Sequence, residues 1–127
     1  MQKLLIMLTS ILLLAGVANA GDFVAEKQAG DMMVKISIGN NPLSVGPNDA
    51  VIELHDGSGK AITDAEVKVY WFMPSMPAMN YEAKADMQGN KYVAVIKPTM
   101  PGTWDADIKV KMKSEDQQKA TISFEAK

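Results

Sequence analysis

The stretch Trp104-Asp105-Ala106-Asp107-Ile108-Lys109-Val110-Lys111-Met112 decides the fold class of this chain. Apolar side chains alternate with charged side chains along its whole length. Alternation with a period of two is typical of a β-strand that has one buried face and one solvated face. The same pattern recurs on both sides of this stretch, so the sequence predicts an all-β domain.

Six further stretches have the same alternation, at residues 34–38, 50–55, 67–71, 81–85, 92–96 and 120–124. Turn-forming residues separate them, for example Asp56-Gly57-Ser58-Gly59 and Gln88-Gly89-Asn90. Seven short strands with turn signals between them predict a seven-stranded, immunoglobulin-like β-sandwich without a helix in the mature chain.

The N-terminus has the three parts of an export signal. Lys3 precedes an apolar run that ends near Leu14, and Val17-Ala18-Asn19-Ala20 supplies small residues for cleavage. The apolar run is too short for a stable membrane span. We therefore predict a signal peptide over residues 1–20 that is cleaved after Ala20, and a periplasmic or secreted protein without membrane insertion. The mature chain is expected to be a flexible leader over 21–30 and one sandwich domain over 31–127.

Composition excludes several classes of function. The chain has no Cys, a single His and a formal net charge of −2, and all of its basic residues are Lys. The absence of a basic field argues against nucleic acid as a partner. No disulfide, thiolate nucleophile or thiolate ligand is available, and no Ser lies in a nucleophile-elbow pattern. We expect a non-enzymatic protein, and a monomer, because Lys-rich outer faces oppose edge-to-edge pairing.

The order of the strands places the connections at two ends. Consecutive strands of such a sandwich run antiparallel, so connections alternate between the ends. This argument places four methionines at one end, namely Met73, Met76, Met79 and Met100. It places His55 and Met87 at the other end.

A methionine occurs at every third position of the segment Met73-Pro74-Ser75-Met76-Pro77-Ala78-Met79. Proline fixes its own φ and pushes the preceding residue toward extended conformations, so we expect a polyproline II segment in which all three thioethers project from one edge. Thioether sulfur is a soft, neutral ligand that suits Cu(I). One interpretation is a Cu(I) site formed by the four methionines, with Trp71 and Trp104 offering an aromatic face to the cation.

Two other interpretations remain open. Methionine fills irregular gaps and packs well against aromatic rings, so these side chains could close the end of the sandwich. An exposed, adaptable methionine surface could instead dock on an envelope protein partner.

The chain also resembles the YtkA-like family of small envelope domains, over about residues 30–112. The residues that carry the resemblance are Gly46-Pro47-Asn48, Asp56-Gly57-Ser58-Gly59-Lys60, Met73-Pro74-Ser75-Met76-Pro77, Gly89-Asn90-Lys91-Tyr92 and Met100-Pro101-Gly102-Thr103-Trp104. The resemblance implies an immunoglobulin-like fold outside the cytoplasm and a relation to copper handling or heavy-metal efflux. Met73, Met76 and Met100 match motif positions, whereas Met79 rests on its spacing. The Met- and His-rich tails that accompany many copper-binding proteins are absent here.

The remaining polar motifs have structural explanations. His55 falls on the polar face of its strand, and a single His without Cys forms an ordinary zinc site only if carboxylates complete it. Asp105 and Asp107 share an outer face with lysines, as expected for a solvated sheet surface. The Asp56-Gly57-Ser58-Gly59 motif lacks the later ligands of a calcium loop and predicts a tight turn.

Overall fold

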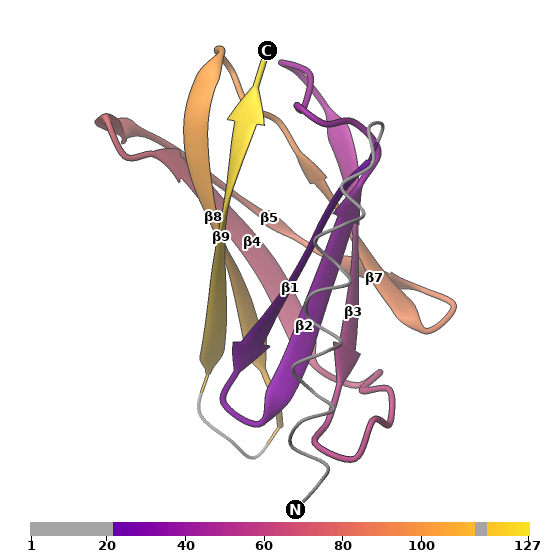
Figure 1. The fold of residues 1–127 in the computed structure, drawn as a ribbon. Coiled ribbons are helices and arrows are strands. Elements are labelled where there is room, and N and C mark those ends of the chain that lie inside the picture. Colours follow the sequence, from indigo (N-terminus) through magenta and orange to yellow (C-terminus); the bar gives the residue numbers. More distant parts are fainter. Residues whose placement is uncertain (1–21, 114–116) are drawn as a thin grey trace, which may run out of the picture.

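The computed structural model describes residues 22–113 and 117–127, and the predicted signal peptide over 1–20 lies outside them. The described residues form nine strands (Figure 1). In chain order these are β1 (Phe23–Ala29), β2 (Met32–Ile38), β3 (Asn48–His55), β4 (Glu66–Met73), β5 (Met76–Lys84), β6 (Asp86–Gln88), β7 (Lys91–Ile96), β8 (Gly102–Lys111) and β9 (Gln118–Ala126). No helix occurs in this part of the chain, and hence none that could cross a membrane.

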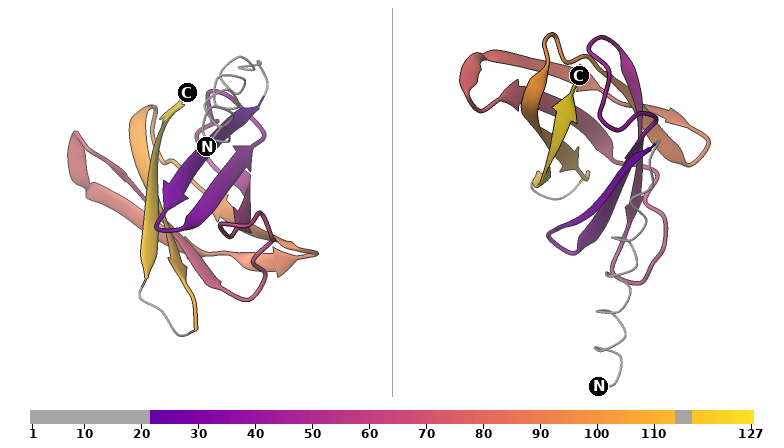
Figure 2. Two further views of the ribbon diagram at one scale, coloured as in Figure 1. Left: turned by 60° about the horizontal axis from the view of Figure 1, so that its bottom comes forward. Right: turned by 45° about the horizontal axis from the view of Figure 1, so that its top comes forward.

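The strands form two antiparallel sheets that face each other (Figure 2). One sheet has the order β1-β2-β3-β7-β6 and the other the order β5-β4-β8-β9. The prediction of an all-β sandwich is confirmed. The decisive stretch at residues 104–112 becomes most of β8, where burial alternates along the strand as its sequence predicts.

Two strands were not predicted. The segment that we expected to be a flexible leader over 21–30 contains β1, which pairs with β2 along its whole length. The ring of Phe23 packs edge-on against Phe124 of β9 at 6.5 Å between centroids, so β1 closes one side of the sandwich. The short strand β6 pairs with β7 across a turn at Gly89, whose φ of 71° is one that Gly adopts readily. The sandwich therefore has nine strands rather than seven.

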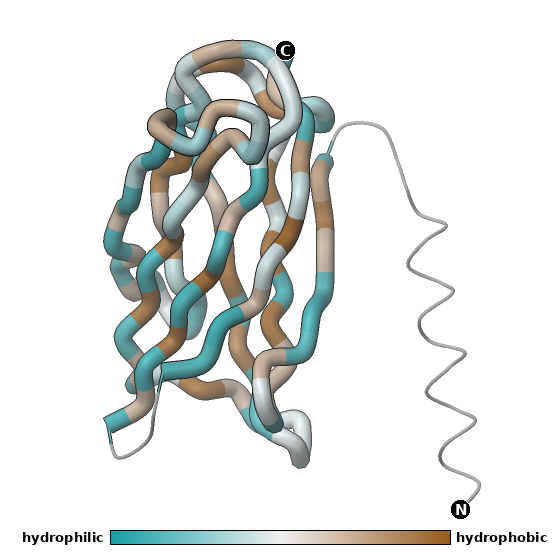
Figure 3. Tube along the Cα trace, turned by 90° about the vertical axis from the view of Figure 1, so that its left-hand side faces the viewer, coloured by the Kyte–Doolittle hydropathy of each residue, from teal (hydrophilic) through white to brown (hydrophobic). Residues whose placement is uncertain are grey.

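The core lies between the sheets and is formed by the inward residues of each strand. Ile36, Ile52, Trp104 and Ile108 are fully buried. Apolar and polar residues alternate along the strands in Figure 3, as a single buried face requires. Each fully buried Ile contributes about 1.5–3 kcal/mol relative to an exposed one, so these positions supply much of the stability of a chain without disulfides.

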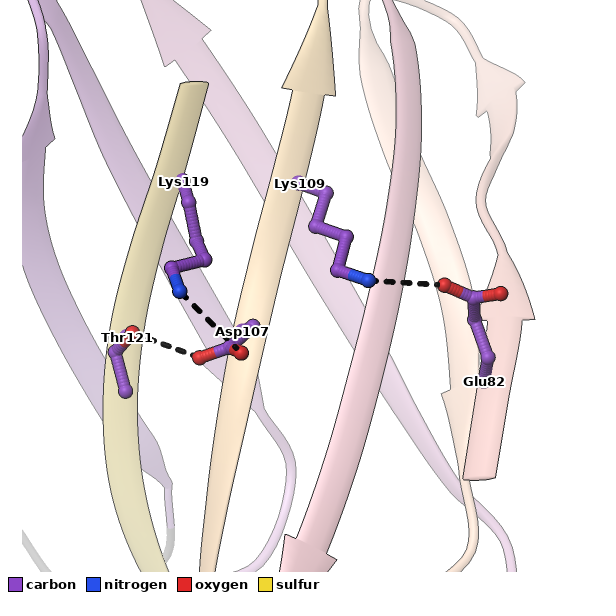
Figure 4. Close-up of polar contacts among 5 residues, drawn as sticks. All are labelled: Glu82, Asp107, Lys109, Lys119 and Thr121. Carbon is purple, nitrogen blue, oxygen red and sulfur yellow. Dashed lines mark hydrogen bonds and ion pairs between the residues drawn. The ribbon is translucent and has the colours of Figure 1, made fainter. Parts of the chain in front are cut away.

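The outer face of the four-stranded sheet carries a polar network (Figure 4). Asp107 accepts a 2.7 Å hydrogen bond from the Thr121 hydroxyl and lies 3.9 Å from the Lys119 ammonium. Lys109 lies 3.4 Å from a carboxylate oxygen of Glu82 on β5, across the intervening strand β4. These contacts agree with the expectation that the outward carboxylates of β8 belong to a solvated surface.

Candidate functional site

The two methionine-bearing connections lie at the same end of the sandwich, at the top of Figure 1. One is the hairpin between β4 and β5, and the other joins β7 to β8. They meet where the Cε methyl of Met73 packs against Gly102, since a β-carbon at Gly102 would lie only 2.8 Å from it. The backbone N–H of Gly46 donates a 2.9 Å hydrogen bond to the carbonyl of Pro98, so the β2–β3 connection joins this end as well.

The segment that we expected to be polyproline II is a β-hairpin. Met73 ends β4, Met76 begins β5, and these two residues are cross-strand partners around the turn at Pro74-Ser75. The register then shifts by three residues on the β5 side, so that Phe72 pairs with Asn80. Because β5 is an edge strand, Pro77 lies in it without removing a hydrogen bond from a central ladder. Ladder pairing with β4 thus prevails over the polyproline preference of the Met-Pro pairs.

The four methionines differ in their accessibility. Met73 is 4% exposed and belongs to the core, whereas Met76 is 45% exposed. Met79 and Met100 are half-buried and pack against the core. The buried Met73 therefore fills the end of the sandwich as the packing interpretation predicts, while the other three methionines are half-buried or exposed.

The two tryptophans at this end are buried. Trp71 is 4% exposed and Trp104 is fully buried, so neither ring offers the open face to a cation that we expected. The Trp71 indole N–H donates a 3.1 Å hydrogen bond to the Lys97 carbonyl. The Trp104 indole N–H donates a 3.1 Å hydrogen bond to the carbonyl of Met100, which anchors the β7–β8 connection.

Tyr81 is an aromatic residue of this end that the sequence analysis did not single out as part of the site. Its half-buried ring lies 5.9 Å from the Trp71 ring and 6.3 Å from the Trp104 ring, between centroids. Its hydroxyl lies 3.2 Å from the Thr99 hydroxyl, which links β5 to the β7–β8 connection. The alternation of β5 places Tyr81 on the inward face, which is a signal available from the sequence. Its contact with both tryptophans depends instead on the pairing of β5, β4 and β8.

Harder ligands do not form a competing site in the described part of the chain. Residues 22–113 and 117–127 contain no group of three or more His, Cys, Asp or Glu side chains that could hold a metal ion. His55 is half-buried at the end of β3, where it pairs with Met33 of β2. The structure therefore places the single histidine at the far end from the four methionines, as predicted.

A hollow of about 770 Å³ at that far end is lined by two carboxylates, Asp31 and Asp56, among other residues. Asp56 accepts hydrogen bonds from the Ser58 hydroxyl at 2.8 Å and from the N–H groups of Ser58 and Lys60 at 2.9 and 3.0 Å. These bonds, that of the Ser58 hydroxyl first, hold the pKa of Asp56 below its ordinary value. A general acid needs the opposite shift, so Asp56 stabilises its own turn and is not suited to acid catalysis.

Comparison with known proteins gives a family and a fold. A model of the YtkA-like family matches residues 26–111. Among solved structures, the soluble domain of PmoD from a Methylocystis species is similar, with a TM-score of 0.58 and 11% sequence identity. The match covers 80% of this chain and 96% of that domain, and at this identity it shows a shared fold alone. No curated protein matches the chain.

Proposed function

The chain belongs to the YtkA-like family, and on that premise we propose that it is an exported, non-enzymatic protein that binds a soft cation, Cu(I) first of all, through thioethers. The observation that carries the proposal is that the β4–β5 hairpin and the β7–β8 connection, at the same end of the sandwich, bear three methionines that are exposed or half-buried, namely Met76, Met79 and Met100. The ion would be cargo, and the protein an accessory of metal handling or efflux.

The donor chemistry supports a soft ion. Thioethers bind Cu(I) and serve hard cations such as Ca²⁺ or Mg²⁺ poorly. The chain has no Cys, so Met supplies all of its sulfur, and the described residues contain no cluster of harder ligands. Neutral sulfur ligands also keep their lone pairs at acidic pH, which suits a protein outside the cytoplasm.

The fold restricts the freedom of these donors. Met76 is held opposite Met73 by the hairpin, and the backbone at Met100 is held by the hydrogen bond from Trp104. A site on paired strands loses less conformational entropy on binding than a site on a free loop. We assign Met76, Met79 and Met100 as ligands, and Met73 as the packed residue that supports them.

A competition titration tests the proposal. Mature protein is titrated with Cu(I) against a chromophoric chelator, in parallel with a Met76→Leu/Met79→Leu/Met100→Leu variant. Leu conserves volume and removes sulfur. We expect the triple variant to lose at least about a hundredfold in affinity, or about 2.8 kcal/mol.

The matched control is Met33→Leu/Met87→Leu, which removes two thioethers that are 38% and 39% exposed and that lie on β2 and β6, outside the β4–β5 hairpin and the β7–β8 connection. Its affinity should stay within about twofold of wild type. Micromolar or weaker binding by the wild type, unchanged in the triple variant, would refute the proposal.

The exposure of Met76 also favours a second candidate function. The β4–β5 hairpin projects from the body of the sandwich (Figures 1 and 2), and its tip carries this 45% exposed side chain. An envelope protein partner could dock on it, because a flexible thioether adapts to varied apolar surfaces. Docking should survive removal of copper in a pull-down with wild-type protein, whereas a metal-dependent complex should not.

A further inference from the structure

We propose that Met76 is an oxidation site, converted to methionine sulfoxide by hydroperoxides while the fold stays intact, and that this conversion releases the soft cation. The oxidation itself rests only on exposure and chemistry. The release of the cation rests on the proposed function. The structure separates Met76 from its cross-strand partner Met73 by a large difference in exposure, 45% against 4%.

Susceptibility to oxidants follows the accessibility of sulfur. Because the chain contains no Cys, no thiol competes with the thioethers for a hydroperoxide. Three methionines of the described residues are exposed. Met76 has the largest exposed fraction, at 45%, followed by Met87 at 39% and Met33 at 38%. Of the methionines in the proposed site it is therefore the first that an oxidant reaches.

The step is balanced without any group from the protein beyond the thioether. A sulfur lone pair attacks one oxygen of hydrogen peroxide, a new S–O bond forms and the O–O bond breaks. The proton on the transferred oxygen passes to the departing hydroxide, which leaves as water. The sulfur is oxidised by two electrons to the sulfoxide, and the peroxide is reduced to water. Methionine sulfoxide reductases reverse this conversion, so the modification is suited to regulation.

Oxidation at Met76 changes the ligand but spares the core. The sulfoxide presents a hard oxygen donor in place of a soft sulfur lone pair, so it no longer suits Cu(I). The side chain is exposed at the start of an edge strand, where water solvates the new oxygen. The same oxygen on Met73 would enter the core beside Gly102, so oxidation there would disrupt packing instead of switching a ligand.

Met33 and Met87 provide internal references for an experiment. Their exposed fractions are close to that of Met76, but they lie on β2 and β6, outside the two connections that carry the proposed ligands. The folded mature protein is treated with hydrogen peroxide, and the sulfoxide at each methionine is followed over time by peptide mass spectrometry. We expect Met76, Met33 and Met87 to react at least about tenfold faster than Met73.

The same time course is repeated with saturating Ag(I), a soft ion that peroxide does not cycle between redox states. Ag(I) should slow oxidation of Met76 at least about tenfold and leave Met33 and Met87 unchanged, since a coordinated lone pair cannot attack peroxide. In a Met33→Leu/Met87→Leu background, oxidised protein should keep its Tm and lose at least about tenfold in Ag(I) affinity. Treatment with methionine sulfoxide reductases should restore that affinity.

The outcomes distinguish the two proposals. Oxidation of Met76 at the rate of Met73 overturns the modification site. If unmodified protein binds Ag(I) tightly but the sulfoxide form binds it equally well, the release step falls and the proposed function stands. Failure of the unmodified protein to bind either Ag(I) or Cu(I) overturns the proposed function together with the release step.

Discussion

Substitution of Gly102 by Ala should destabilise the end of the sandwich that carries the methionines. Gly102 begins β8 with a φ of 137°, a value that L side chains rarely adopt. A β-carbon there would also lie 2.8 Å from Cε of Met73. Both effects oppose Ala, but they differ in size and can be measured separately.

The backbone effect should be the larger. A non-Gly residue held at a sparsely populated positive φ costs about 1–3 kcal/mol. The steric effect is smaller because Cε is the end of a flexible side chain, and moving Met73 off its rotamer costs about 0.5–1.5 kcal/mol. We expect Gly102→Ala to lower the free energy of unfolding by about 2–4 kcal/mol, with a fall in Tm of about 4–8 °C per kcal/mol.

A double-mutant cycle in urea separates the two terms. Met73→Ala alone should cost about 2–5 kcal/mol by leaving a cavity. The double variant Gly102→Ala/Met73→Ala should lose less free energy of unfolding than the sum of the two single variants. The difference should equal the steric term, about 0.5–1.5 kcal/mol, because Ala at position 73 removes the clash. A Gly102→Ala cost below about 0.5 kcal/mol would refute the backbone argument. A coupling energy equal to the whole cost of Gly102→Ala would show that the clash alone is responsible.

Three further predictions concern polar groups. Tyr92→Phe should lower the free energy of unfolding by about 1–3 kcal/mol in chemical denaturation. The buried hydroxyl donates a 3.0 Å hydrogen bond to the Ile62 carbonyl and accepts a 3.1 Å hydrogen bond from the Ala65 N–H. Burial raises the Tyr92 pKa above 10.0, so the tyrosine ionises at lower pH in the unfolded chain than in the folded protein. The contribution of neutral Tyr92 to the free energy of unfolding is therefore complete below pH 10 and is lost as the pH rises through the folded pKa. Tyr92→Phe should remove this dependence of stability on pH. Asn48→Asp should cost about 2–4 kcal/mol at pH 7 in thermal melts, and less at acidic pH, because the buried amide donates to three backbone carbonyls that a carboxylate would repel. Asp56→Ala should speed amide hydrogen exchange in its turn. The Ser58 hydroxyl lowers the Asp56 pKa below its ordinary 3.8, so in the wild type that protection should be complete above pH 3.8 and be lost as the pH falls through the lowered pKa.

The strand pattern could be predicted because alternation is a local property. The residues of β8 show which side of the strand faces the core before any partner is known. The antiparallel order of the strands likewise predicts that Met73 and Met100 lie at the same end. Strand β1 was missed because its face is only half-buried and becomes apparent through its partner β2.

The candidate site was predicted in composition but not in shape. Spacing every third residue suggested one exposed edge for Met73, Met76 and Met79. The hairpin and the register shift at Phe72 and Met73 replace that edge with a buried, an exposed and a half-buried side chain. Local preferences of Pro cannot predict this result, because ladder pairing with a distant part of the chain outweighs them.

The sequence by itself determined the class of fold, the exclusion of thiol chemistry and the concentration of thioethers at one end. Only the tertiary structure decided that Met73 is sealed against Gly102, that Met76 faces water and that Tyr81 lies above Trp71 and Trp104. The physical reason is the separation along the chain of the residues that set each property. Alternation and ligand type reside in neighbouring residues, whereas the accessibility of a given sulfur depends on strands that are far apart in the chain and meet only after folding.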